Sequence, residues 1–385
     1  MPDRSLPTEL RITRYGNQVV KRTRFEVRYA DPEHPLYEEL RQRYRLDEVV
    51  GSQSSQFGQL VALRDWLRGR WAHGWDGTRL ITSGLEVLRQ VEQGKELHCW
   101  YFTMAFCACA SALGFQARPV AIGKASTDFI PPDEVNISHV TAEAWSNTHG
   151  KWVVMDTDAN CHYERAGVPL SAYEVRMAWL QGEAERVTRV TGPTPAAITT
   201  RTEVFSDAQK KALFDTFFRH DVMDYYHYLR FLLRMDLVEA SEQELGHLQA
   251  HATSLAFGQP GLPAAQWLDE HSPPQLYMEN WPVPPDLKFT ACLDDVYWTL
   301  NQAEIGLRCA REPSGSAPPL LQVTLDTVTP SFGHFEVRLG AGAWERKPSR
   351  FDWPLRQGRS LIAARAVNKR GLHGPLSAIE VSYKP

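Results

Sequence analysis

One long apolar run constrains the fold of this chain more than any other feature. From Cys99 to Leu113 the sequence CWYFTMAFCACASAL contains no charged residue, and Gly114 follows where a helix is expected to end. Ala, Leu and Met all favour a helix. Because a helix that is apolar on every side has to be buried, we expect this segment to be a core helix.

Cys99 differs from the other cysteines of this helix in its position. It lies in the first turn, where unpaired backbone N–H groups and the helix dipole favour a thiolate. Cys107 and Cys109 follow further along the helix among Ala and Phe residues, where free cysteines commonly serve as packing. We therefore expect an exposed, reactive thiolate at Cys99 and two structural thiols behind it.

A nucleophilic thiol needs a base and a group that orients the base, and both occur downstream. HVTAEAW (139–145) and KWVVMD (151–156) have strand character, and SNTHG between them supplies turn residues, which predicts a hairpin. His139 begins the first strand and Asp156 ends the second, so the two side chains can face each other across the hairpin. Asp158, in the sequence DTD, is the alternative orienting residue.

The remaining patterns divide the chain into three predicted parts. Residues 1–190 contain an N-terminal segment and an α+β domain, in which SQFGQLVALRDWLRGRW (55–71) has the apolar spacing of an amphipathic helix. Residues 191–285 are predicted to be a helical region, with helices over 206–218 and 221–236, followed from residue 258 by a Pro-rich linker that can neither hold a helix nor join a central strand.

The third part, residues 286–385, has short alternating runs such as LQVTL, HFEVRL, LIAARAV and AIEVSY, separated by Gly, Pro and Asn turns. This spacing predicts a β-sandwich. The expected fold class is therefore α+β with a helical insert, followed by an all-β sandwich.

Composition narrows the classes of partner. The net charge of −4 and the pI near 6.4 argue against nucleic acid, which is usually bound by a basic surface. No apolar stretch is long enough to span a membrane, and the start MPDRSLPTEL lacks the apolar core of a signal peptide, so we expect a cytoplasmic protein without a membrane partner. No metal or cofactor motif occurs, and no pattern indicates an oligomeric state.

The order of these motifs resembles the transglutaminase-like superfamily over roughly residues 50–165. The resemblance rests on Cys99 followed by Trp100, on GFQAR (114–118), on His139 with Glu143 four places on, and on Trp152 four places before Asp156. It implies a papain-like core in which Cys99 is the nucleophile, His139 the general base and then acid, and Asp156 the group that orients the imidazole. It also implies an amide-bond reaction through a thioester. The acidic chain and the appended sandwich indicate a peptide, protein or glycoconjugate as the substrate.

One departure from the family pattern is that His98 stands where the crosslinking enzymes carry Gln, which puts a crosslinking activity in doubt. The C-terminal sandwich resembles a fibronectin-III or immunoglobulin-type module, which often accompanies enzymes that act on large substrates. The resemblance leaves protease, amidase and acyltransferase activities open.

Two other functions are compatible with the residues. One is a noncatalytic protein that binds a peptide or glycan, and the other is a glycan-active enzyme that uses cleft carboxylates. Four residues are weaker candidates for substrate or oxyanion contacts, with packing as the alternative for each: Trp71, Trp100, Glu143 and Asp158.

Overall fold

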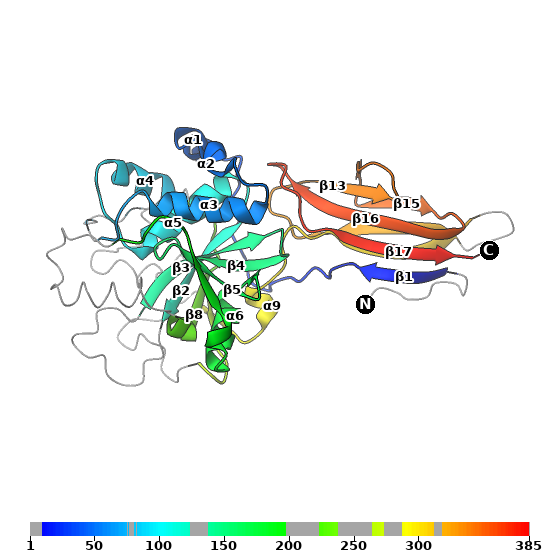
Figure 1. Ribbon diagram of the computed structural model, residues 1–385. Helices are drawn as coiled ribbons and strands as arrows, with labels where there is room; N and C mark the ends of the chain where they lie inside the picture. Colours follow the sequence, from blue (N-terminus) through cyan, green and yellow to red (C-terminus); the bar gives the residue numbers. More distant parts are fainter. Residues whose placement is uncertain are drawn as a thin grey trace. The chain divides into compact units, whose positions relative to one another are not determined.

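The computed structural model describes residues 10–74, 76, 81, 83–123, 138–197, 223–237, 264–272, 287–311 and 318–384. It forms two compact units (Figure 1). The α+β unit comprises Thr23–Ser146 and Lys151–Val296, and the β unit comprises Met1–Arg22, Asn147–Gly150 and Tyr297–Pro385. Residues 10–22 thus belong to the β unit, whereas the sequence-based division placed an N-terminal segment in the same part as the α+β domain.

A six-stranded sheet is the centre of the α+β unit. Its strand order is β10-β9-β8-β2-β3-β4, and every neighbouring pair is antiparallel except β9 and β10. The strands are β2 (Ala117–Gly123), β3 (Ser138–Ser146), β4 (Lys151–Met155), β8 (Tyr228–Leu232), β9 (Ala264–Trp267) and β10 (Leu287–Thr290). The hairpin predicted from the sequence is confirmed as β3 and β4, which pair from Ser146–Lys151 to Ala142–Met155.

The apolar run forms helix α5 (Cys99–Ala112), and all of its residues are buried. It packs against β2 and β3 of the sheet and is flanked by α1 (Pro35–Arg43), α3 (Gln56–Arg68) and α4 (Gly84–Glu92) (Figure 1). The amphipathic helix predicted from residue 55 is confirmed as α3: Ser55 caps it, and its Leu60, Leu63 and Leu67 face the core. A short helix α2 (Leu46–Val50) joins α1 to α3.

Smaller elements complete this unit. A second sheet has the order β6-β5-β7, built from β5 (Cys161–Arg165), β6 (Val168–Pro169) and β7 (Thr188–Thr191). Helix α6 (Ala172–Leu180) begins with a capping box, and it is followed by η1 (Ala184–Arg186); η3 (Met223–His227) precedes β8, and α9 (Leu293–Val296) ends the unit.

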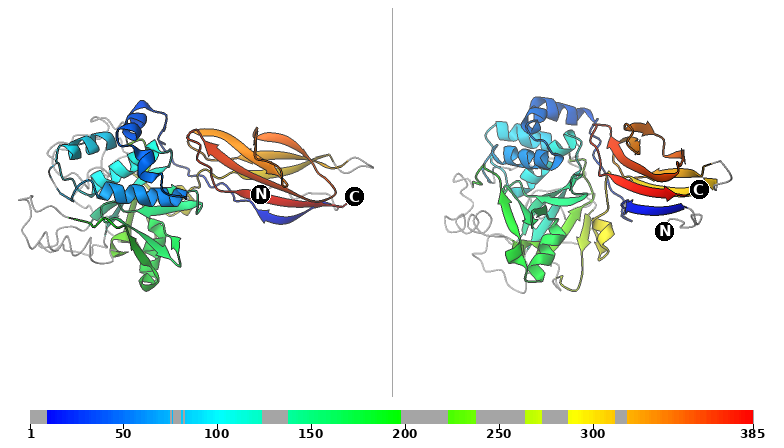
Figure 2. Two further views of the ribbon diagram at one scale, coloured as in Figure 1. Left: turned by 45° about the horizontal axis from the view of Figure 1, so that its top comes forward. Right: turned by 45° about the vertical axis from the view of Figure 1, so that its right-hand side comes forward.

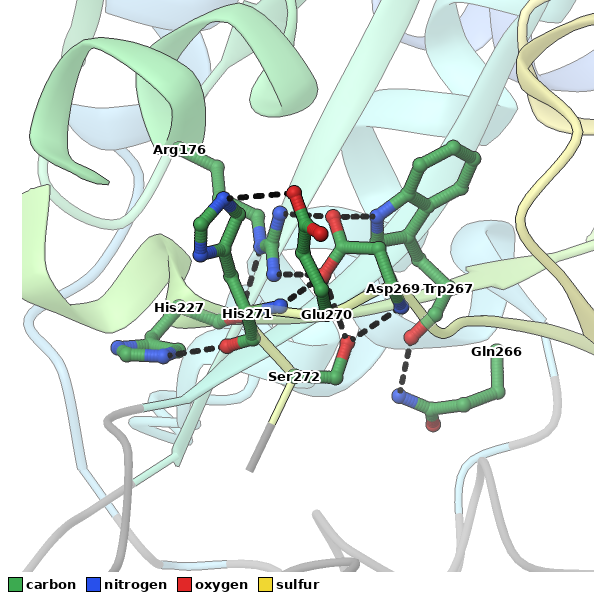
Figure 3. A network of polar contacts seen from close by, with 8 residues as sticks. All are labelled: Arg176, His227, Gln266, Trp267, Asp269, Glu270, His271 and Ser272. Atoms are coloured by element: carbon green, nitrogen blue, oxygen red, sulfur yellow. Dashed lines mark hydrogen bonds and ion pairs between the residues drawn. The ribbon is translucent and has the colours of Figure 1, made fainter. Parts of the chain in front are cut away.

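A polar network fixes the segment after β9 to helix α6 (Figure 3). Arg176 of α6 is fully buried and donates two hydrogen bonds of 2.7 Å to the carboxylate of Asp269. The indole N–H of Trp267 donates to the same carboxylate at 2.8 Å. Burial raises the pKa of Asp269, but the bonds from Arg176 and Trp267 outweigh it and hold that pKa well below its ordinary value.

Two expectations for residues 191–285 are wrong where the structure describes them. Within the helix predicted over 221–236, residues 228–232 form strand β8, because Val120–Gly123 of β2 supply a pairing edge that the local sequence does not reveal. Within the Pro-rich linker, Ala264–Trp267 form an internal strand, β9; this proline-free stretch begins directly after Pro263. The helix predicted over 206–218 lies outside the described residues.

The β unit contains a five-stranded sheet, β1-β17-β16-β13-β14, and a three-stranded sheet, β11-β12-β15. Residues of both sheets share one apolar core, which confirms the predicted all-β region. Strand β1 pairs with β17 at one sheet edge (Figures 1 and 2). The strands are β1 (Leu10–Gly16), β11 (Glu304–Arg311), β12 (Leu320–Asp326), β13 (Phe332–Leu339), β14 (Glu345–Lys347), β15 (Arg350–Pro354), β16 (Gly358–Asn368) and β17 (Ser377–Tyr383).

Neither unit contains, among its described residues, a helix that is long and apolar enough to cross a membrane.

Candidate active site

Cys99 is the first residue of α5, as the sequence predicts, and His98 is the N-cap. Only 2 % of Cys99 is exposed, so the expectation of an exposed thiolate is wrong. The physical reason is that α5 is buried along its entire length, its first turn included. The Cys99 thiol therefore sits where backbone N–H groups lack helical partners and where water is largely excluded.

His139 and Asp156 meet across the β3–β4 hairpin. In the register of these strands, Ala142 pairs with Met155, so Asp156 lies diagonally across from His139 on the sheet. The Nε2 atom of His139 is 2.8 Å from Oδ2 of Asp156, and both side chains are buried. Because a carboxylate only accepts hydrogen bonds, His139 is the donor, which leaves its Nδ1 for the thiol of Cys99.

The charge state of His139 follows from these contacts. Burial lowers the pKa of His139, but the charge and hydrogen bond of Asp156, together with the hydrogen bond and charge of Cys99, raise it well above 6.5. The imidazole therefore holds a proton at neutral pH. A protonated His139 between Asp156 and Cys99 is the arrangement that stabilises a thiolate.

The turn that carries Asp156 is held from two sides. Its Oδ1 accepts the backbone N–H of Ala159 at 2.9 Å, and its main chain pairs with Cys161. Arg64 of α3 reaches into the turn and donates to Oδ1 of Asn160 at 3.0 Å. These bonds restrict the Asp156 side chain to the position that His139 requires.

Asp158 belongs to a second histidine–carboxylate pair. Its Oδ2 is 2.6 Å from Nδ1 of His73, and the pair is buried. Burial raises the pKa of Asp158, but His73, Arg68 and His139 together lower it below its ordinary value, so this side chain is a carboxylate at neutral pH. His139 donates its Nε2 hydrogen bond to Asp156, whereas Asp158 is bonded to His73.

The pKa of His98, the residue before Cys99, is shifted in the opposite direction from that of His139. Burial, reinforced by the nearby His73, lowers the pKa of His98 to about 3 despite the charge of Asp158, so His98 is neutral. Its ring packs against that of Tyr101, with centroids 4.6 Å apart. Within the described part of the chain, Nδ1 of His98 is buried without a hydrogen-bond partner. The sequence analysis assigned neither His73 nor His98 a role in the site. His73 could not be found from the sequence, because only the fold brings it to Asp158.

The weaker candidates have structural partners. Trp71 donates its indole N–H to the Leu97 carbonyl at 3.0 Å. The N–H that would have to bind an oxyanion is therefore already used within the fold. Trp100 is fully buried in α5. Glu143 is fully buried, with one carboxylate oxygen bonded to Arg118 and the other to the backbone N–H of Ala172, each at 2.7 Å. These contacts favour the packing interpretation for all three residues.

Cys99, His139 and Asp158 form a compact cluster. One thiol, imidazole or carboxylate atom from each lies within 4.8 Å of the others. Such groups can ligate Zn²⁺, but only with an unprotonated imidazole nitrogen. Since Asp156 and Cys99 both hydrogen-bond His139 and favour its protonated form, the cluster fits acid–base chemistry at a thiol better than a metal centre.

Comparisons with known proteins identify the same region. Residues 43–157 match the family model of the transglutaminase-like superfamily, and this stretch contains Cys99, His139 and Asp156. These residues therefore form a transglutaminase-like domain. No curated protein matches the sequence. Among solved structures, 27 chains match; one is a transglutaminase from red sea bream, at 12 % identity and a TM-score of 0.23, covering 89 % of this chain and 71 % of that chain.

Proposed function

We propose that the protein is a cysteine hydrolase or acyltransferase that acts on an amide bond of a peptide, protein or glycoconjugate. The observation that carries the proposal is the buried chain of contacts from Asp156 through His139 to Cys99 at the N-terminus of α5. The match of residues 43–157 to the transglutaminase-like superfamily supports it.

In the proposed reaction the Cys99 thiolate attacks the amide carbonyl carbon and forms a tetrahedral intermediate. His139 then gives its proton to the departing amine, the C–N bond breaks, and a thioester remains on Cys99. Water or a second amine attacks the thioester, His139 takes the proton of that nucleophile, and Cys99 leaves as the thiolate. Asp156 keeps the imidazole oriented and stabilises its charged form.

The position of Cys99 also supplies a means of stabilising the intermediate. Its own backbone N–H is one of the groups that lack a helical acceptor, and it lies at the positive end of the helix dipole. A developing oxyanion beside Cys99 would accept this hydrogen bond in a site from which water is largely excluded.

We also propose that the β unit is a fibronectin-III or immunoglobulin-type module that contacts a large substrate. Its support is the pair of sheets, five-stranded and three-stranded, that share one apolar core. The two alternatives from the sequence have less support. A binding protein needs no protonated histidine beside a thiol. A carboxylate mechanism would use Glu143 together with Asp158, and both oxygens of Glu143 are already bonded inside the fold.

The test is acylation by an activated ester, p-nitrophenyl acetate, followed by release of p-nitrophenolate and by the mass of each cysteine peptide. We expect one acetyl group on Cys99, no acylation in Cys99→Ala, and normal acylation in the matched control Cys107→Ala, whose thiol is buried further along α5. Folded protein that is not acylated at Cys99, or Cys99→Ala with full turnover on any amide substrate, would refute the proposal.

A further inference from the structure

The charges of the chain are distributed unevenly between its two units. The β unit contains 17 Lys and Arg residues against 9 Asp and Glu residues, a net charge of +8. The α+β unit contains 25 against 37, a net charge of −12, so a basic unit is present within an acidic chain. Positive charge on a protein surface attracts acidic partners. The proposed thioester chemistry makes no use of this charge.

The β unit contains a pocket of about 900 Å³ that lies where β13 and β15 end and β16 begins. Its walls are the turn after β13 (340–342) and the loop between β15 and β16 (356–357). The backbone N–H of Gly340 donates to the Leu361 carbonyl at 2.7 Å, which fixes the turn to β16. The pocket is therefore formed by the fold itself and has room for several side chains of a ligand.

Part of the pocket lining is apolar. Trp353 belongs to the core of the unit and is only 5 % exposed, whereas Leu339 packs against the same core and is half-buried. Leu361 is half-buried as well, and Pro354 is exposed. Because Trp353 is too deeply buried to stack on a nucleic-acid base, this lining suits an aliphatic side chain better than a base.

Two arginines supply positive charge to the same lining. Arg356 is exposed and has no hydrogen-bond or ion-pair partner among the described residues. The side chain of Arg359 is 76 % exposed and lies 3.8 Å from the carboxylate of Glu380. That carboxylate also accepts a hydrogen bond of 2.6 Å from Thr13, and it is one negative charge against two positive ones. Guanidinium groups in this state can bind an incoming carboxylate.

We propose that this pocket binds an acidic segment of a partner polypeptide. A Glu or Asp side chain of the segment pairs with Arg356 and Arg359, and a neighbouring aliphatic side chain packs on Leu339 and Leu361. The inference adds a binding site, with the chemistry of its ligand, to the proposed role of the β unit. It does not depend on the thioester reaction.

The experiment measures peptide binding to the full-length protein by fluorescence anisotropy. The probe is a fluorescein-labelled peptide of four Glu-Leu-Gly repeats, and two matched peptides carry Gln in place of Glu or Ser in place of Leu. We expect saturable binding of the probe that weakens as the salt concentration is raised. The Kd of each matched peptide should be higher by about tenfold or more, because one loses the charged hydrogen bonds and the other the buried aliphatic side chain.

A double variant locates the binding site. In Arg356→Gln with Arg359→Gln, the Kd of the probe should rise by about tenfold or more, whereas acylation of Cys99 by p-nitrophenyl acetate should stay the same. The matched control is Arg308→Gln with Arg350→Gln, which removes the same charge from exposed positions of β11 and β15 outside the pocket lining. The Kd should rise much less in this control.

Three results would overturn the inference: no saturable binding at protein concentrations up to about 1 mM, equal binding of the peptide that carries Gln, or equal weakening in the two double variants. A labelled single-stranded oligonucleotide that binds more tightly than the probe would also overturn it, because the β unit would then be a nucleic-acid-binding module. Should the double variant not fold, the three peptides with the unmodified protein decide. Failure of acylation at Cys99 is measured separately and refutes only the proposed reaction.

Discussion

The neutral histidine beside Cys99 makes the stability of the protein sensitive to acid. The pKa of His98 is about 3 in the folded protein, against 6.5 for an ordinary histidine. Between these values the unfolded chain binds a proton at His98 that the folded protein does not. Stability therefore rises with pH across this range and falls on acidification, with a slope that approaches about 1.4 kcal/mol per pH unit.

The magnitude follows directly. Taking the protein from about pH 7.5 to about pH 4.5 should remove about 3 kcal/mol of unfolding free energy through His98 alone. We would measure urea unfolding at both pH values for the unmodified protein, for His98→Gln, and for the control Tyr101→Phe, which keeps the ring packed on His98. The pH-dependent loss should be smaller by about 3 kcal/mol in His98→Gln and unchanged in Tyr101→Phe. Equal losses in all three proteins would show that His98 accepts a proton in the folded state and would refute the reasoning.

Three further predictions concern other parts of the α+β unit. Asp156→Asn should slow acylation by about a hundredfold or more. The alkaline limb of the pH–rate profile lies above pH 6.5, because the pKa of His139 is raised, and in Asp156→Asn it should move to lower pH. A limb that does not move would contradict the pairing of His139 with Asp156. Gly84→Ala should lower the unfolding free energy by about 1–3 kcal/mol, because a Cβ at this position would lie 2.9 Å from a carbonyl oxygen of α5. An unchanged melting temperature would exclude this close approach of α4 to α5. Arg118→Met should cost about 3–5 kcal/mol by leaving the buried Glu143 unpaired, and the double variant with Glu143→Met should recover part of that loss in urea unfolding.

The sequence was informative where function depends on local structure. The charge-free run predicted α5 and put Cys99 in its first turn, and alternation with turn residues predicted the β3–β4 hairpin that joins His139 to Asp156. Each of these features needs only neighbouring residues and one short-range pairing.

Features that depend on distant pairing could not be predicted in the same way. Strand β8 is a buried segment whose conformation is decided by the edge of β2, more than a hundred residues earlier in the chain. His73 meets Asp158 only because the loop after α3 and the turn after β4 converge in the fold. The exposure predicted for Cys99 was wrong because sequence gives the position of a residue on its helix but not what covers the helix end.

The central claim is that Cys99 reacts as a thiolate because His139 holds the proton. The most direct measurement is the rate of alkylation of each cysteine by iodoacetamide as a function of pH, with the exposed Cys292 as an internal reference. The ratio of the Cys99 rate to the Cys292 rate should rise as the pH falls below about 8.5, the ordinary cysteine pKa, and this rise should disappear in His139→Asn. A ratio that stays constant with pH, or is the same in His139→Asn, would contradict the account.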